Sequence, residues 1–182
     1  MSTFEWVTLA VVLLVGLGWF LSYSAARLDR LHGRIEGTQA ALDAQLVRRA
    51  EATLELANTG TLDAASALIL AGAATESLDS VDDLDPAREA VESELTEALE
   101  VALSTEVVEL LRAEGGLGEE ALERVRSAGL RVQLARRFHN DAVTDARRVR
   151  RKVSVRVFRL AGHADMPRTF EFDDELPSAI PA

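Results

Sequence analysis

The sequence predicts an all-α protein in which an N-terminal transmembrane helix continues into an antiparallel four-helix, coiled-coil-like bundle. Residues 6–23 form an apolar run without a charged side chain. Aromatic residues make up only 5% of the chain, and the helix-forming residues Ala, Leu, Glu and Arg dominate after residue 24. Pro86 is the only proline before Pro167, so long helices can run without interruption.

The apolar run is predicted to be a membrane anchor over residues 1–24. As a helix it extends about 27 Å at ~1.5 Å per residue, close to the ~30 Å hydrocarbon core of a bilayer. A cleaved signal peptide is the main alternative, but it requires a basic start, and the residues before Trp6 include Glu5 and no Lys or Arg. A buried core helix rarely needs an uncharged run of this length.

The residues around the anchor predict its orientation. Aromatic rings, which favour the headgroup level, lie at both ends, and Arg27, Arg30 and Arg34 follow on the C-terminal side. The positive-inside rule then places the N-terminus outside the cell membrane and the bundle in the cytoplasm. Gly18 and Ser22 have the small-xxx-small spacing that can bring anchors together as a homo-oligomer, although lipid-facing small residues are the commoner case.

The bundle is predicted over residues 25–162, and its first helix leaves the membrane without a break. Apolar residues recur at helical spacing up to Ala57, and the following Asn-Thr-Gly ends the helix. The second helix is expected over residues 61–78, with Thr61 as its N-cap.

The third helix is predicted from Pro86 to about Arg112. An Asp-rich turn precedes it, and proline suits the first position of a helix. Ser104 and Thr105 could divide this helix into two pieces, a question that the sequence leaves open.

The fourth helix is predicted from about Glu119 to Ala161, where Gly162 can end it. Gly129 weakens the first part, since a mid-helix glycine costs ~1 kcal/mol against alanine. Residues 153–160 also alternate like a strand, but the helical spacing carries through them. The apolar stripe of this helix comprises Phe138, Ala142, Ala146, Val149, Val153, Val157 and Leu160.

The remaining residues, 163–182, are predicted to form an extended acidic tail. The segment contains prolines and carries an excess of Asp and Glu. Phe170 and Phe172 are the residues expected to hold the tail against the bundle.

Three segments resemble the LemA family of bacterial membrane-anchored proteins. Residues 42–49 (L-D-A-Q-L-V-R-R) resemble that family's D-x-Q-L-x-R-R segment, residues 135–143 (A-R-R-F-H-N-D-A-V) resemble its A-R-x-x-Y-N-x-x-V segment, and residues 170–175 match its F-x-F-x-x-E tail. His139 stands where the family usually has Tyr. The resemblance implies an N-terminal anchor, an outside N-terminus and a helical bundle; it implies no substrate.

A polar layer is predicted where these segments face each other. In an antiparallel pair of the first and fourth helices, residues whose numbers sum to about 180 lie at the same height along the bundle axis. Polar groups of the two helices therefore meet at mid-bundle. Such a layer most often fixes the register of a bundle, and a ligand site is the alternative. Its expected members are Asp43, Gln45, Arg48, Arg49, Arg136, Arg137 and Asn140.

A basic collar is predicted at the membrane-proximal end. The net charge of −10 conceals a segment, residues 124–160, with 12 basic and 2 acidic residues. By the same rule its end returns to the level of Arg27, next to anionic lipid headgroups. A solvated or intrabundle-paired face is the alternative, and nucleic acid is not expected because aromatics are not interleaved. The collar comprises Arg27, Arg30, Arg34, Arg147, Arg148, Arg150, Arg151, Lys152, Arg156 and Arg159.

No catalytic, metal or cofactor motif is found in the sequence. Cysteine is absent, the three histidines are scattered, and no G-x-S-x-G or H-E-x-x-H occurs. His139 is expected to be a packed core residue. We therefore expect a non-catalytic interaction or scaffold protein that acts through a protein partner or a second copy. The alternative is a small-molecule or lipid-binding bundle, which a pocket of several hundred Å³ between the first and fourth helices would favour.

Overall fold

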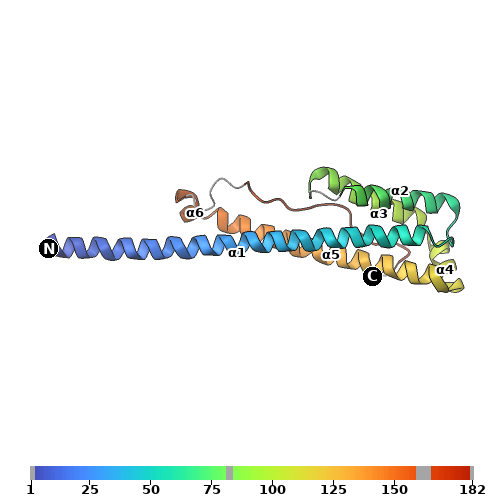
Figure 1. Ribbon diagram of the computed structural model, residues 1–182, viewed down its shortest axis with the longest axis horizontal. Helices are drawn as coiled ribbons and strands as arrows, with labels where there is room; N and C mark the ends of the chain where they lie inside the picture. Colours follow the sequence, from blue (N-terminus) through green and yellow to red (C-terminus); the bar gives the residue numbers. More distant parts are fainter. Residues whose placement is uncertain (1–2, 81–83, 159–164, 181–182) are drawn as a thin grey trace. The chain divides into compact units, whose positions relative to one another are not determined.

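The computed structural model describes residues 3–80, 84–158 and 165–180 (Figure 1). Within these ranges the chain forms no strand, and the predicted all-α class is confirmed. The described helices are α1 (Thr3–Ala57), α2 (Ala64–Asp79), α3 (Pro86–Ala102), α4 (Thr105–Glu114), α5 (Gly116–Arg150) and α6 (Val153–Val157). α3 and α4 together occupy the predicted third helix, and α5 and α6 the predicted fourth.

The chain folds into two compact units, and α1 and α5 each contribute to both of them. The first unit comprises Met1–Gly37 and Asp141–Arg168, and the second unit comprises Thr38–Asn140 and Thr169–Ala182. The predicted bundle, residues 25–162, therefore supplies helices to both units, and the tail is divided between them.

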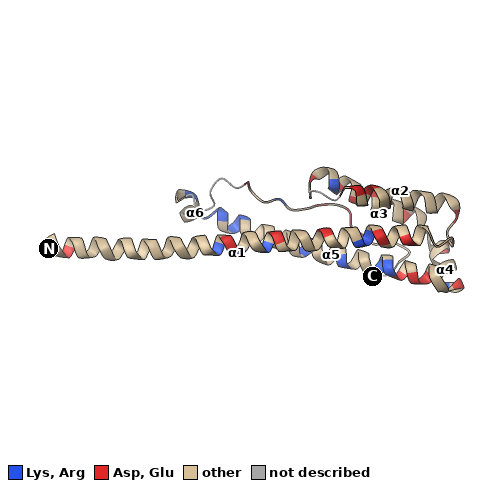
Figure 2. Ribbon diagram, viewed as in Figure 1, with Lys and Arg blue, Asp and Glu red and all other residues tan. Residues whose placement is uncertain are grey.

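α1 is one unbroken helix of 55 residues, as predicted. Its apolar part has a mean hydropathy of 2.0 and is not buried by any other part of the described chain. By length and composition alone, this part is long and apolar enough to cross a membrane. Figure 2 shows no charged residue on α1 between Glu5 and Arg27. Burial of α1 begins only beyond this part, at Leu28.

The predicted antiparallel register of α1 and α5 is confirmed inside each unit. In the first unit, Nη1 of Arg34 lies 3.2 Å from Oδ2 of Asp145. In the second unit, Nε of Arg124 lies 2.9 Å from Oε2 of Glu55. The residue numbers of both pairs add to 179, close to the expected sum.

The second unit contains the largest core. Leucine side chains of α1, α2, α3 and α4 meet valine and alanine side chains of α5, and each fully buried leucine contributes roughly 1.5–3 kcal/mol to stability. α2 packs against α3, and its alanines allow a close approach. The residues at the centre of this core include Leu56, Leu70, Leu95, Leu103, Leu111 and Val125.

The ends of the middle helices follow their capping residues. The predicted N-cap of the second helix, Thr61, is wrong: Asp63 caps α2 by accepting hydrogen bonds from the backbone N–H groups of Ala65 and Ser66. Thr61 instead lies 2.6 Å from the hydroxyl of Thr59. Asp and Thr are both good caps, so composition alone could not separate them.

The other two helix starts agree with the sequence. Asp85 caps α3, which begins at Pro86 as predicted. Ser104 caps α4, so the third predicted helix is divided at the suspected position. Gly115 and Gly116, both with positive φ, make the turn into α5.

The prediction of a single fourth helix ending at Ala161 is wrong. α5 ends at Arg150, Lys152 takes an extended conformation, and the chain becomes helical again in α6. Three basic residues in the last turn of α5 favour a helix end at this point through the helix dipole. The alternating β-branched residues that follow have low helix propensity. Leu160 and Gly162 lie outside the described residues.

This break changes which side chains are buried. Val155 is buried, whereas Val153 and Val157, which the predicted stripe placed in the core, are 75% and 67% exposed. Phe138, in the second unit, is also exposed, at 53%. The rest of the stripe up to Val149 is buried, as predicted.

The described part of the tail is extended, and its two phenylalanines hold it as predicted. Phe170 and Phe172 are buried with Leu42, Leu46 and Val132 in the second unit. Their rings are 5.2 Å apart.

Candidate functional site: a buried arginine–carboxylate network and a basic collar

A fully buried carboxylate lies at the centre of the second unit. Glu92 of α3 has 0% exposure. Its Oε1 accepts hydrogen bonds from Nε of Arg88 (2.6 Å) and from the hydroxyl of Ser77 (2.8 Å). Its Oε2 accepts one from Nη2 of Arg49 at 2.7 Å. Both oxygens of Glu92 are therefore used by buried donors.

The two arginines reach Glu92 from different helices. Arg88 precedes Glu92 by one turn of α3, while Arg49 extends from α1 and also donates to the hydroxyl of Thr96 and to the backbone carbonyl of Glu92. Arg88 also donates to the backbone carbonyl of Ser80. This network joins α1, α2 and α3 through side chains that are themselves inaccessible to solvent.

The network contains more positive than negative charge at its buried centre. Arg49 and Arg88 are 3% and 2% exposed, and Glu92 is the one fully buried acid among the described residues. Burial lowers the pKa of Arg49, and the charges of Glu92 and Asp174 oppose that shift. Arginine stays protonated even so, and the cluster therefore depends on its carboxylates for neutrality.

The tail supplies one of these carboxylates. Arg136 of α5 makes two parallel hydrogen bonds to Asp174, from Nε (2.7 Å) and Nη2 (2.8 Å), a geometry that gives both strength and direction. These hydrogen bonds raise the pKa of Arg136. The guanidinium groups of Arg49 and Arg136 lie 5.4 Å and 5.6 Å from the centre of the Phe172 ring, within the range of cation–π attraction.

Side chains of α5 and α3 also bind the tail backbone. The amide of Asn140 accepts from the N–H of Phe170 at 2.9 Å and donates to its carbonyl at 3.1 Å, as a neighbouring β-strand would. On α3, the hydroxyl of Thr96 donates to the carbonyl of Asp173 at 2.6 Å, and that of Ser93 accepts from its N–H. The tail is thus held between these two helices of the second unit.

The predicted polar layer is only partly brought together in this form. Arg49, Arg136 and Asn140 are half-buried or buried, but they bind α3 and the tail rather than one another. Asp43 lies 4.0 Å from Nη2 of Arg88. The other predicted members are the half-buried Gln45 and the exposed Arg48 and Arg137.

Sequence reasoning missed Arg88, Glu92, Ser77 and Asp174. One signal was available for the first two, because they occupy the same helical stripe as Leu95 and Leu99, at spacings of three and four residues. Polar residues in an apolar stripe indicate a buried pair. No comparable sequence signal marked Ser77 or Asp174.

The basic collar lies in the first unit, and most of it is exposed. Leu28 of α1 packs with Val149 of α5 and Val155 of α6, so the three elements that carry the bases are packed together. Arg147 donates to the carbonyl of Pro167 at 2.7 Å, and Arg150 to that of Asp165. Arg159 lies outside the described residues. The exposed members are Arg27, Arg30, Arg34, Arg148, Arg151, Lys152 and Arg156.

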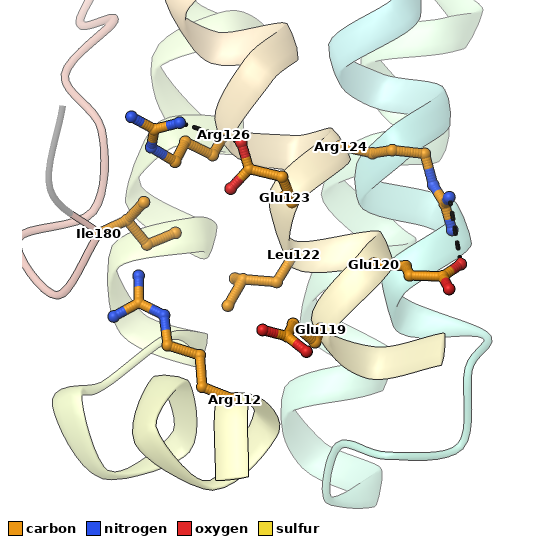
Figure 3. A pocket seen from close by; sticks show the side chains of 8 residues that line it. All are labelled: Arg112, Glu119, Glu120, Leu122, Glu123, Arg124, Arg126 and Ile180. Atoms are coloured by element: carbon orange, nitrogen blue, oxygen red, sulfur yellow. Dashed lines mark hydrogen bonds and ion pairs between the residues drawn. The ribbon is translucent and has the colours of Figure 1, made fainter. Parts of the chain in front are cut away.

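Two surface hollows among the described residues lie in the second unit. One, of about 440 Å³, lies beside the start of α5, where Figure 3 shows Ile180 of the tail near Leu122, with Arg112 and Arg126 on either side. The other, of about 350 Å³, lies between α1 and α5 and includes Arg48 and Arg131. It has the size and position that the sequence associated with ligand binding, although its lining is mostly charged.

His139 is 3% exposed, which agrees with its predicted place in the core. No group of three or more potential metal ligands occurs among the described residues.

The comparisons with known proteins assign the chain to no family. Protein-family models give no match to the sequence, and comparisons with curated proteins and with solved structures give no significant similarity.

Proposed function

We propose that this protein is a single-pass membrane protein whose helical body is a non-catalytic interaction module on the cytoplasmic side. One observation carries the proposal: α1 leads from an exposed, uncharged apolar stretch into the packed helices without a break. An apolar surface of this length is unfavourable in water and suits the hydrocarbon core of a bilayer. The resemblance to the LemA family supports the same arrangement.

The basic collar supports the cytoplasmic orientation of the body. Arg27, Arg30 and Arg34 follow the apolar stretch, whereas Glu5 precedes it. The cytoplasmic leaflet carries anionic lipids, and each base close to it contributes about 1 kcal/mol of attraction. Anionic headgroups are therefore the first partner that we assign to this protein.

The buried network supports a binding role rather than a catalytic one. Both oxygens of Glu92 already accept hydrogen bonds from buried donors, and Asp174 is held by Arg136. A catalytic acid or base needs access to a substrate, whereas Glu92 joins helices to one another and Asp174 joins the tail to α5. The body then offers its outer surfaces to a protein partner or to a second copy.

A small-molecule or lipid-binding bundle is the second candidate. The hollow between α1 and α5 favours it by size and position. Its lining includes Glu51, Glu55, Glu120 and Glu123 beside three arginines, whereas binding pockets are mostly apolar with few polar groups. We therefore rank this candidate below the interaction module.

The orientation can be tested with reporter fusions at Ala182 in the full chain. We expect a cytoplasm-dependent fluorescent reporter to be active and a reporter that needs export to be inactive, with the protein retained in membranes after alkaline extraction. The opposite reporter pattern would contradict the cytoplasmic assignment, and release by alkaline extraction would contradict the anchor. Photocrosslinking in intact membranes would then identify the partner.

A further inference from the structure

The first unit exposes a small apolar surface that the sequence did not predict. Val153 and Val157 are 75% and 67% exposed, and Phe158, directly after α6, is 43% exposed. Val153 and Val157 are four residues apart, so the two valines share one side of the short helix. Val155 points the other way and is buried. α6 therefore buries Val155 and presents apolar groups outward.

This surface lies next to the part of α1 where the apolar stretch ends. Val155 packs with Leu28 and Val149 in one cluster of the first unit. Leu28 follows Tyr23, the last residue of the uncharged stretch, by five residues, or about 7.5 Å at ~1.5 Å per residue of helix. If α1 crosses a bilayer, α6 lies at the depth of the headgroups.

The apolar groups are surrounded by exposed basic side chains. Arg151 and Lys152 precede α6, and Arg156 lies within it. The described acids of the first unit that lie beyond the apolar stretch are Asp29, Glu36, Asp141, Asp145 and Asp165. One of these, Asp145, is paired with Arg34, and the bases outnumber the acids. An apolar face bordered by bases is typical of elements that lie in the interface of an anionic membrane.

We propose that α6 is a membrane-interface element that inserts Val153, Val157 and Phe158 between the headgroups of an anionic bilayer. Arg151, Lys152 and Arg156 bind the lipid phosphates, with their aliphatic stems along the apolar residues. The bundle is thereby held at two points, the anchor and α6. This inference rests on the proposed anchor and adds a second lipid-binding surface to it.

The test uses single cysteines in the full chain, which contains no native cysteine. Three variants are labelled with a polarity-sensitive fluorophore: V157C in α6, V15C in the anchor and A113C on the exposed surface of α4 in the second unit. They are reconstituted in vesicles of phosphatidylcholine and phosphatidylglycerol that carry nitroxide lipids at the headgroup or at mid-chain.

We expect the label at V157C to emit at shorter wavelength than the label at A113C and to be quenched by the headgroup nitroxide. The label at V15C should be quenched by the mid-chain nitroxide. Equal aqueous exposure of V157C and A113C, with V15C quenched, would overturn this inference and leave the anchor intact. Unquenched V15C would overturn the anchor and this inference together.

A charge variant tests the chosen partner. R151E/K152E should lower the equilibrium constant for membrane insertion of the segment labelled at V157C by at least roughly fivefold for each base lost. R131E/R137E alters two exposed bases of the second unit and is the matched control. Equal quenching in both variants, or in vesicles of phosphatidylcholine alone, would contradict recognition of anionic lipid.

Discussion

The two units use charge in opposite ways. In the second unit, Arg49, Arg88 and Glu92 are buried, and both arginines bind Glu92. In the first unit, most of the bases stay exposed, and nearby apolar side chains such as Val153 are exposed with them. A unit that satisfies its polar groups internally depends little on its surroundings. A unit that leaves bases and apolar groups outward needs a surface that accepts both, and an anionic bilayer is such a surface.

The largest expected effect comes from breaking the buried network. E92A removes the one carboxylate that Arg49 and Arg88 share and leaves two buried cations, at a cost of about 3–5 kcal/mol. Urea unfolding of the full chain in detergent, followed by circular dichroism, measures this loss. The control is E94A on the exposed side of α3, which should change stability by less than ~0.5 kcal/mol. Similar urea midpoints for E92A and E94A would show that the buried network contributes nothing to stability.

A pair of phenylalanine variants compares the units directly. F172A removes a buried ring from the second unit and should cost about 3 kcal/mol. F158A removes a half-exposed ring from the first unit and should leave detergent stability almost unchanged, while weakening the association of α6 with anionic vesicles. The same unfolding experiment measures the stability of both variants, and the nitroxide quenching of the V157C label measures the association of α6 with vesicles. A large loss for F158A in detergent would mean that this ring is part of a core.

Glycine variants sharpen the comparison at a smaller scale. A Cβ added at Gly33 in the first unit meets nothing within 4 Å, whereas one added at Gly129 meets Cδ2 of Leu176 at 2.6 Å. G33A should therefore stabilise its helix by about 0.5–1 kcal/mol. In G129A the same gain is offset by displacement of the Leu176 side chain, so G129A should gain less stability than G33A. Equal gains would indicate that the tail does not approach α5 so closely.

The smallest expected effect concerns the last part of the tail. Glu100 accepts hydrogen bonds from the hydroxyl and N–H of Ser178, which lower the pKa of its carboxyl below the usual glutamate value. Because the folded-state pKa is lowered, the contact stabilises the protein at pH values above the ordinary pKa of glutamate. This stabilisation is lost as the pH falls through the lowered value. NMR titration should show the pKa of Glu100 rising in S178A. An unchanged titration would argue against the contact.

The parts that the sequence predicted depend on local chemistry. The unbroken α1 follows from an uncharged run joined to a helical stripe, the start of α3 follows from Asp85 and Pro86, and the burial of Phe170 follows from two aromatic residues in a polar tail. Each of these signals lies within a few residues of the feature it determines.

The parts that the sequence did not predict depend on distant partners. Asp174 becomes a structural residue only because Arg136, far away in the chain, is folded next to it. The break after Arg150 contains neither glycine nor proline, so periodicity carried the predicted stripe through it and gave Val153 the wrong environment. The collar was predictable as a set of charges, but the apolar surface within it was not.

Hydrogen exchange of the full chain in lipid nanodiscs tests the difference between the units most directly. When phosphatidylcholine is replaced by a mixture that contains phosphatidylglycerol, we expect amides of residues 148–158 to become more protected. Amides of residues 88–96 and 170–176 should exchange slowly at the same rate in both lipids. No lipid-dependent protection in the first segment, or an equal change in all three, would contradict the account.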